Sequence, residues 1–369
     1  MAEYDPMEEL GFTHDKQLVC TCLGFLQTND STRDLCGRFI RDGEKFYDLL
    51  ARYEDVATYV LGRSGRSGNV ARGAVPFLKA FGATDYAMLR CCEESLRPMP
   101  GAKRAMRYLL STLPTFVNTS SYEHNVMALC EALDMPIGIC EYSTAEMSSY
   151  EIGRQDGRAI RDFASRITGL RTPQSVYRLN TPVILEEDEA RLIETMDGIF
   201  DDKLEKLEAG RMMKSVTPFG AGEKVNALLN LRKRTLIDMD GTAYIGGNMM
   251  DYQAMDVVRD GNGLSMSFNG SEFAVHGSNI AVLSRDCTVA AVLVQEFYNL
   301  GIEAVYDLVS GWDRETLERS DCPDRTLMDS MLAAHPRKLP EVHIIDESNV
   351  NEIALKSDDY RKRLLNSRF

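Results

Sequence analysis

The sequence predicts an α/β protein, with a core that contains a parallel β-sheet and with two mostly helical cap insertions. Short apolar runs typical of strands alternate with helix-like segments between residues 99 and 148 and again between 214 and 310. This alternation is typical of parallel sheets, because parallel strands are joined through crossover helices. The apolar residues of 34–98 and 149–213 instead recur mainly at helical spacing. We therefore expect a core of residues 17–33, 99–148 and 214–310, two cap insertions (34–98 and 149–213), and a C-terminal extension over 311–369.

The composition is that of a globular, acidic protein. The chain has 369 residues, a length that is enough for a full core with insertions. Its formal net charge is −14. No apolar run approaches the roughly 18 to 20 residues of a membrane span. The start of the chain is acidic where a secretory signal would be positively charged, so we expect a cytoplasmic protein without membrane insertion. The acidic balance argues against nucleic acid as a partner, since such binding requires clustered Lys and Arg.

The cysteines indicate reduced, buried thiols. They are scattered and often lie in apolar runs, which favours packing over a disulfide framework. Cys20 and Cys22 have no second pair at zinc-site spacing. The full set is Cys20, Cys22, Cys36, Cys91, Cys92, Cys130, Cys140, Cys287 and Cys322.

The core is expected to begin with a strand in QLVCTCLGFL, residues 17–26, which stops at a polar turn. The first insertion then has helical spacing from Asp34 to Leu61 and again from Val75 to about Leu96. Between these stretches lies the glycine-rich segment GRSGRSGN, which we interpret as a hinge rather than as an anion-binding loop.

The second piece of the core starts at Met99. It reads as a turn and helix in PMPGAKRAMRYLLSTLP, a strand with a hydroxyl-rich end in TFVNTSS, and a helix in YEHNVMALCEALDM. The second insertion contains EEDEARLIETMDGIFDDKLEKLEAGRMMK, whose acidic first turn favours a helix. We interpret this segment as a cap or packing helix.

The third piece alternates from Lys224 to about Leu308. The expected helices are EKVNALLNLRK, MDYQAMDVVRD, SEFAV and CTVAAVLVQEFYNLG, and the expected strands are TAYIGG, GLSMSF and NIAVLS. The C-terminal extension holds one more strand-like run, EVHIID.

The most specific motif spans residues 246–284. In phosphatases of the haloacid dehalogenase (HAD) superfamily, a metal-binding G-D-x-x-x-D-x-x-M segment is followed by a helix, a strand, an Asn-Gly turn, and a strand that ends in Ser or Thr. The segments GGNMMDYQAM, GLSMSFNG and NIAVLS fit this order. The chemistry also needs an aspartate nucleophile after the first strand, a hydroxyl after the second, and a lysine.

The chain also resembles a known family. The segments LLARYEDVATYVLGR, VPFLKAFGAT, PGAKRAMRYL, PTFVNTSSYEH, GEKVNALLN and LSMSFNGSEFAV resemble an archaeal HAD-like family that includes proteins described as subunit R of energy-converting hydrogenase A. The resemblance covers most of residues 17–300, and SFNGSEFA and TSSYEH are its most distinctive parts. It implies a HAD-like Rossmannoid core with helical caps and, where the family is intact, Mg²⁺-dependent phosphatase chemistry.

When the motif positions of this family are transferred to the sequence, the resemblance implies a degenerate catalytic site, in which some of the required residues are missing. The hydroxyl of the second motif is Ser120, with Thr119 as a close rival, and the lysine is Lys224. The later metal aspartate is Asp251, while the earlier one falls on Gly247. The expected phosphate-binding residues are Ser120, Lys224, Asn269 and Gly270.

The carboxylate nucleophile is missing from this pattern. The first strand, CTCLGFL, offers no acid before Asp30. With Asp251 as the only metal carboxylate, Mg²⁺ binding should be weak or lost. Cys20 and Cys22 lack the phosphate-binding loop and arginine that a thiolate phosphatase needs. We therefore expect lost or weakened phosphohydrolase activity, with a cleft that binds a phosphorylated small molecule or a surface that binds a protein partner.

An active enzyme is the alternative. In TLIDMDGTAY, Asp238 would be the nucleophile and Asp240 the acid/base of a Mg²⁺-dependent phosphomonoesterase. Ser284, Lys338, Asp346 and Glu347 would supply the remaining parts in the right order. Because this assignment leaves residues 1–230 unexplained, we interpret DMDG as a polar turn before the strand Ala243 to Ile245.

Overall fold

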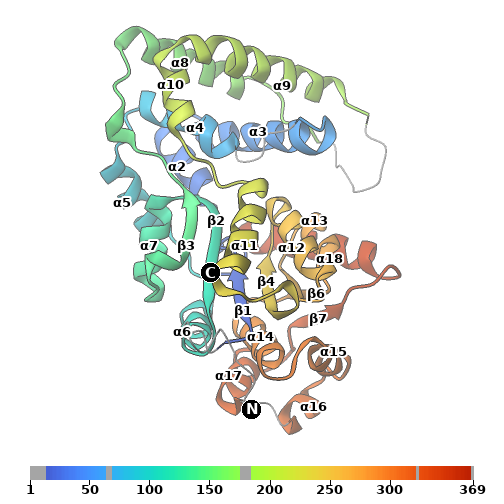
Figure 1. Cartoon of the computed structure of the whole chain (residues 1–369). Coiled ribbons are helices and arrows are strands. Elements are labelled where there is room, and N and C mark those ends of the chain that lie inside the picture. Colours follow the sequence, from blue (N-terminus) through green and yellow to red (C-terminus); the bar gives the residue numbers. More distant parts are fainter. Residues whose placement is uncertain (1–13, 64–68, 175–183, 321–323, 367–369) are drawn as a thin grey trace.

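The computed structural model describes residues 14–63, 69–174, 184–320 and 324–366, and its centre is a seven-stranded sheet (Figure 1). The strand order is β3-β2-β1-β4-β5-β6-β7. Strands β1 to β6 are parallel, and β7 runs antiparallel to β6. The predicted α/β fold class with a parallel sheet is therefore confirmed. The strands are β1 (Gln17–Cys20), β2 (Thr115–Tyr122), β3 (Cys140–Ser143), β4 (Thr242–Gly246), β5 (Leu264–Phe268), β6 (Ile280–Leu283) and β7 (Glu341–Ile344).

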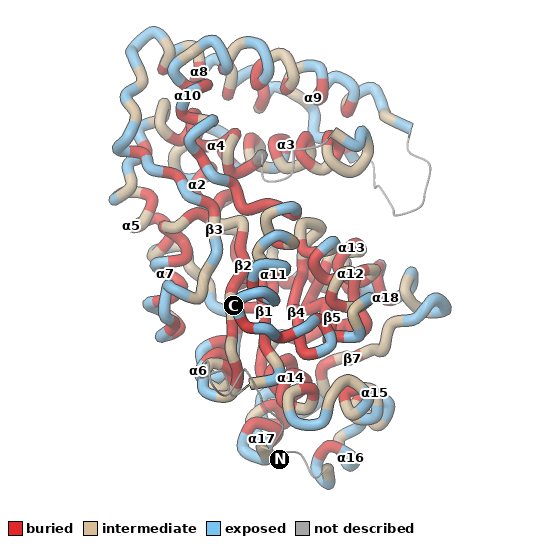
Figure 2. Tube along the Cα trace, viewed as in Figure 1, coloured by how far each residue is buried: buried red, intermediate tan, exposed pale blue. Residues whose placement is uncertain are grey.

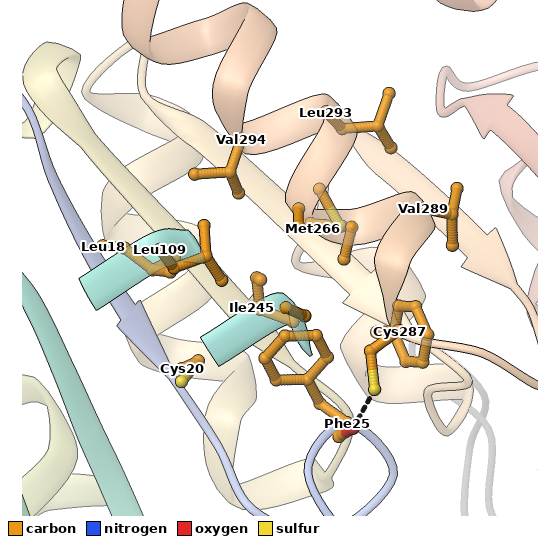
Figure 3. Close-up of a cluster of buried hydrophobic side chains, with 14 of the residues drawn as sticks. Leu18, Cys20, Phe25, Leu109, Ile245, Met266, Cys287, Val289, Leu293 and Val294 are labelled. Atoms are coloured by element: carbon orange, nitrogen blue, oxygen red, sulfur yellow. Dashed lines mark hydrogen bonds between the residues drawn. The ribbon is translucent and has the colours of Figure 1, made fainter. Parts of the chain in front are cut away.

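Helices cover both faces of the sheet. Strands β1, β4 and β5 are buried along their whole length (Figure 2), as expected for parallel strands between two helical layers. Leu18 and Ile245 lie in one apolar cluster with residues of α6 and α14 (Figure 3), and Val19 and Tyr244 lie in another with residues of α11 and α12. The core helices are α6 (Ala102–Thr112), α7 (Glu123–Leu133), α11 (Ala221–Thr235), α12 (Tyr252–Asp260), α13 (Glu272–His276), α14 (Thr288–Leu300), α15 (Ile302–Ser310), α16 (Arg314–Arg319), α17 (Arg325–Ala334) and α18 (Val350–Asn366).

The two helical insertions form one cap. Their buried apolar side chains belong to a single cluster, which includes Phe46 and Phe77 from the first insertion and Ile160 and Leu192 from the second. The cap lies beyond the end of the sheet to which β2 leads (Figure 1). Its helices are α2 (Ser31–Phe39), α3 (Gly43–Asp55), α4 (Asn69–Ala80), α5 (Asp85–Ser95), α8 (Arg154–Thr168), α9 (Glu187–Asp197) and α10 (Glu208–Ser215), with π-helical turns at Val56–Val60 and Gly198–Lys203.

Polar contacts also join the two insertions. The guanidinium of Arg52 on α3 pairs with Glu189 on α9, and the Tyr53 hydroxyl donates to Asp197 over 2.7 Å. Arg63 pairs with the same Asp197 carboxylate at 2.7 Å. Segments more than 130 residues apart in the sequence are thus held together, since Arg63 and Asp197 are separated by 134 positions.

Several expected elements are shortened or divided in the structure; the helical stretch predicted from Val75 to about Leu96, for example, is divided into α4 and α5, with Gly82 between them at a φ of +91°. The strand predicted over residues 17–26 ends at Cys20, because the chain then turns: Gly24 has a φ of +94°, and its N–H donates to the carbonyl of Gln27. The helical stretch predicted from Asp34 to Leu61 is divided into α2 and α3, and Asp42 between them has a left-handed φ of 53°.

Two further expectations concern particular segments of the chain. Residues 64–68 lie outside the described part, so the hinge interpretation of GRSGRSGN stays a prediction. Among the described helices, none has the length and apolar character needed to cross a membrane.

Candidate functional site

A cavity of about 210 Å³ lies between the cap and the carboxyl ends of the parallel strands. Ligand sites in open α/β sheets lie outside this edge, because the loops that follow the strands converge there. The core side is formed by the loops after β1, β2 and β4. The cap side is formed mainly by α3. Polar lining residues are Thr21, Gln27, Thr119, Ser120, Ser121 and Asn248 from the core, and Asp30, Thr32, Tyr47, Glu54 and Asp55 from the region of α2 and α3.

The side chain that follows β1 in the cavity is Thr21. Its N–H donates to the carbonyl of Ile245, so the chain still runs beside β4 at this point. The neighbouring Cys20 and Cys22 belong instead to the apolar cluster that includes residues of α6 and α14. Burial raises the pKa of the Cys22 thiol to about 12 and that of Cys20 well above its usual range, so both stay protonated at neutral pH and are poor nucleophiles.

The loop after β1 is held by contacts with the apolar core. Phe25 packs in the apolar cluster, and the Cys287 thiol donates to its carbonyl over 2.9 Å (Figure 3). This anchor holds the loop in a fixed path past the cavity. Sequence reasoning did not single out Thr21, although it is the one polar side chain in LVCTCLGFL and lies in the position where a nucleophile would follow the strand.

Ser120 and Thr119, the hydroxyl residues predicted from the second motif, both line the cavity. They lie near the end of β2, where Thr119 is buried. The Thr119 hydroxyl accepts the N–H of Ser121 over 3.2 Å, and the Ser143 hydroxyl donates to the Ser120 carbonyl over 2.9 Å. The backbone at the end of β2 is therefore held in place by its neighbours.

Lys224 and Asp251 form a buried ion pair behind the cavity. The ammonium of Lys224 on α11 lies 2.6 Å from Asp251 Oδ1, and the two side chains are 1% and 0% exposed. Asp251 also accepts the Tyr244 hydroxyl at 3.3 Å, and its Oδ2 accepts the N–H groups of Gly247 and Asn248 at 2.9 and 2.8 Å. These backbone bonds form because Asp251 ends a short 3₁₀ turn, Met249–Asp251, and its carboxylate reaches back to the start of that turn.

The residues present do not fit the Mg²⁺ ion that the family resemblance implies. Four donors occupy the two oxygens of Asp251, whereas Mg²⁺ requires carboxylate oxygens free to complete an octahedron. At the earlier metal position, Gly247 offers no side chain. Within the described residues, no three His, Cys, Asp or Glu side chains come together in a way that could hold a metal.

Asn269 and Gly270, predicted to bind phosphate, hold loops together outside the cavity lining. The Asn269 amide donates to the Ser284 carbonyl over 2.8 Å and accepts the Ser284 N–H over 2.9 Å. The Gly270 carbonyl accepts the Ser357 hydroxyl over 2.7 Å. A Cβ atom at Gly270 would lie 2.2 Å from the Ser267 hydroxyl oxygen and 2.8 Å from the Ala274 Cβ, so a side chain there would require its neighbours to shift.

The residues of the D-x-D-G-T alternative do not lie together. Asp238 and Asp240 are exposed and precede β4, at the amino edge of the sheet, and Asp238 pairs with Arg232 at 2.6 Å with its side chain 62% exposed. Asp346 follows the antiparallel strand β7 and so lies at the same amino edge, whereas Ser284 follows β6 at the carboxyl edge. Lys338 is exposed and pairs with Glu341. DMDG is a 3₁₀ turn between α11 and β4, as the polar-turn interpretation predicts.

The cap side of the cavity is acidic. Asp30 caps α2 by accepting the N–H groups of Thr32 and Arg33, and it also accepts the Tyr47 hydroxyl over 2.6 Å. Glu54 accepts the N–H of Val70 at 2.7 Å. Burial raises the pKa of Asp55 to about 6, against the opposing charge of Arg52. A ligand in this cavity therefore meets hydroxyls and amides on the core side and carboxyl groups on the cap side.

One buried cation near the cavity was not foreseen from the sequence. Arg361 of α18 is 8% exposed, and its guanidinium donates to the Asn248 side chain, which lines the cavity, and to the Asn269 carbonyl. No local motif surrounds Arg361, so its position depends entirely on how the C-terminal helix packs.

Comparisons with known proteins identify the fold. No family model matches the chain, and no curated protein matches it. Among solved structures, gene product AF1437 from Archaeoglobus fulgidus has a TM-score of 0.77 at 20% identity, covering 95% of this chain and 96% of that chain. A phosphoserine phosphatase with a phospho-aspartyl intermediate analogue has a TM-score of 0.47 at 12% identity, covering 76% of this chain and 99% of its own. An apo phosphoserine phosphatase has a TM-score of 0.44 at 13% identity, covering 73% and 94%. This chain shares its fold with the archaeal gene product over nearly its whole length.

Removal of one partner of the Lys224–Asp251 pair should destabilise the fold strongly. Lys224→Met leaves a carboxylate buried without its counter-charge, so we expect the free energy of unfolding to fall by about 3 to 5 kcal/mol in urea denaturation. The matched control is Arg232→Met in the exposed pair with Asp238, where a loss of about 1 kcal/mol or less is expected. Equal losses in the two variants would contradict the assignment.

Asp55 should make stability depend on pH. Its pKa is about 6 in the folded protein against an ordinary 3.8, so the folded state binds the proton more tightly and loses stability as the pH rises from about 4 to about 6. Asp55→Asn should therefore raise the free energy of unfolding above pH 6 by up to about 3 kcal/mol and change it little below about pH 4. Urea denaturation across this pH range measures the difference, and a pH-independent effect would refute the prediction.

Proposed function

We propose that this chain is a HAD-like, phosphatase-like protein whose phosphohydrolase activity is lost or strongly weakened, and that its cap–core cavity binds a small phosphorylated molecule. The observation that carries the proposal is the presence of Thr21 where the side chain after β1 meets the cavity. A threonine there cannot supply the carboxylate that forms an aspartyl-phosphate. Loss of one such catalytic group typically lowers the rate by several orders of magnitude.

The other candidate nucleophiles do not replace a carboxylate at this position. The thiols of Cys20 and Cys22 are protonated and packed in the apolar cluster. Asp251 is bound by Lys224, Tyr244 and two backbone N–H groups. The alternative of an active enzyme through Asp238 would need residues from opposite edges of the sheet to meet, so the geometry favours the degenerate site.

The ligand class follows from the lining of the cavity. A volume of about 210 Å³ suits a small metabolite rather than a drug-sized molecule. Thr21, Thr119 and Ser120 offer hydroxyl donors to phosphoryl oxygens on the core side. Asp30, Glu54 and Asp55 would repel a phosphate on the cap side. We therefore infer that a phosphorylated ligand directs its phosphate toward the sheet and an uncharged or cationic end toward α3.

Hydrolysis of p-nitrophenyl phosphate tests the loss of activity. With Mg²⁺ present, the wild type is expected to release nitrophenol no faster than a heat-inactivated sample, and Asp238→Asn is expected to behave in the same way. Turnover by the wild type that Asp238→Asn abolishes would establish the active alternative. Turnover that survives in Asp238→Asn would also overturn the proposal, because it would require a nucleophile at the carboxyl edge.

Thermal unfolding with inorganic phosphate and phosphorylated metabolites tests the binding role. A ligand at 100 times its dissociation constant should stabilise the fold by about 2.7 kcal/mol, and Ser120→Ala should reduce this shift. Ser111→Ala, remote from the cavity on α6, is the matched control and should leave the shift unchanged. Absence of a shift with every phosphorylated compound would reject the ligand and favour a role as an interaction subunit with a protein partner.

A further inference from the structure

The C-terminal helix α18 reaches the carboxyl edge of the sheet through two buried polar side chains one turn apart. The Ser357 hydroxyl donates to the Gly270 carbonyl over 2.7 Å, and Arg361 Nη1 donates to the Asn269 carbonyl over 3.1 Å. Arg361 Nη2 donates to Asn248 Oδ1. The helix packs beside α13 (Figure 1). These contacts bring a guanidinium from the end of the chain to the loops that follow β1, β4 and β5.

Two glycines make room for this guanidinium. A Cβ atom on Gly247 would lie 3.4 Å from Arg361 Nη1, and one on Gly24 would lie 3.1 Å from the same atom. The Cβ of Gly247 would also lie 3.3 Å from the Leu23 carbonyl in the loop after β1. A carboxylate at position 247 would therefore lie beside the guanidinium of Arg361. Gly247 is also the position at which the sequence pattern lacks the earlier metal aspartate.

The groups around Arg361 include carboxylates, whose negative charge a metal ion could also neutralise. Burial lowers the pKa of Arg361, and the carboxylates of Asp251, Asp358 and Asp30 oppose this effect, with Asp251 the strongest. An arginine stays protonated under such conditions. Asp30 lines the cavity and Asp251 lies behind it, so the positive charge of the guanidinium acts on carboxylates in both places.

We propose that the guanidinium of Arg361 takes the place of the divalent cation, so that helix α18 supplies a positive charge behind Asn248 in the cavity lining and the chain does not bind Mg²⁺ there. At this position the chain thus has a glycine at 247 and a guanidinium from α18 beside it, in place of a carboxylate and a metal ion. A metal needs anionic ligands, whereas Arg361 is satisfied by the Asn248 amide oxygen and the Asn269 carbonyl. This inference is independent of whether the cavity retains any hydrolytic activity.

The test restores the carboxylate and removes the guanidinium. Thermal unfolding is measured for the wild type, Gly247→Asp/Arg361→Ala and Gly247→Asp/Arg363→Ala, each in EDTA and in millimolar MgCl₂. Arg363 is exposed on the same helix. Gly247→Asp/Arg363→Ala therefore serves as the control, because it has the same net charge as Gly247→Asp/Arg361→Ala but keeps Arg361. In Gly247→Asp/Arg361→Ala the new carboxylate would lie beside the Asn248 side-chain oxygen and the Asn269 carbonyl, which Arg361 no longer occupies. These oxygens, rather than those of Asp251, could bind Mg²⁺, so only this variant is expected to melt at a higher temperature in MgCl₂, by about 2 °C or more.

The outcomes separate clearly. The proposal would be overturned if Mg²⁺ raised the melting temperature of the wild type, or if it raised the melting temperatures of the two double variants equally. It would also be overturned if folded Gly247→Asp/Arg361→Ala melted at the same temperature in EDTA and in MgCl₂. If that variant does not fold, the single variant Gly247→Asp decides. There the new carboxylate lies beside the guanidinium, so its melting temperature should be the same in EDTA and MgCl₂, and a rise would refute the replacement. Phosphatase assays do not enter this test, so its result can differ from that of the proposed function.

Discussion

The buried ion pair between Lys224 and Asp251 is the constraint on which the arrangement of the site depends. Two full charges in a dry interior are stable only when further hydrogen bonds satisfy the remaining lone pairs. Asp251 meets this condition by accepting from the Tyr244 hydroxyl and from the N–H groups of Gly247 and Asn248. The pair therefore ties α11, β4 and the loop after β4 into one unit. Asn248, which lines the cavity and accepts from Arg361, owes its position to this unit.

The chemistry of the cavity follows from what surrounds this pair. Asp251 is fully occupied, Thr21 has no charge, and Gly247 has no side chain, so the core side of the cavity lacks free carboxylates. On that side, the guanidinium of Arg361 lies beside Gly24 and Gly247. The acids are instead on the cap side, in Asp30, Glu54 and Asp55. This distribution favours holding a phosphoryl group by hydroxyls and amides over attacking it.

The cap is built by the packing of two insertions that are distant in sequence. Neither insertion alone encloses the shared apolar cluster, since aromatic residues of α3 and α4 pack against Phe200 of the second insertion. The Arg52–Glu189 and Arg63–Asp197 ion pairs also join the two insertions. Because α3 is part of this body, the acidic residues at the end of α3 are presented to the cavity at a fixed position.

The sequence by itself determined what depends on neighbouring residues. Apolar periodicity predicted the helices and strands from Met99 to Leu133 and from Lys224 to Leu300, because it reflects which side of each element is buried. Local motifs pointed to Ser120, Lys224 and Asp251, which the fold brings to one edge of the sheet. The tertiary structure decided which edge of the sheet each loop occupies. Because β4 and β6 run in the same direction, Asp238, which precedes β4, and Ser284, which follows β6, lie at opposite edges. The tertiary structure also decided the position of Arg361, whose partner Asn248 is 113 residues away in the chain. Such a contact arises from the packing of α18 on the finished core, and no short-range pattern in the sequence encodes it.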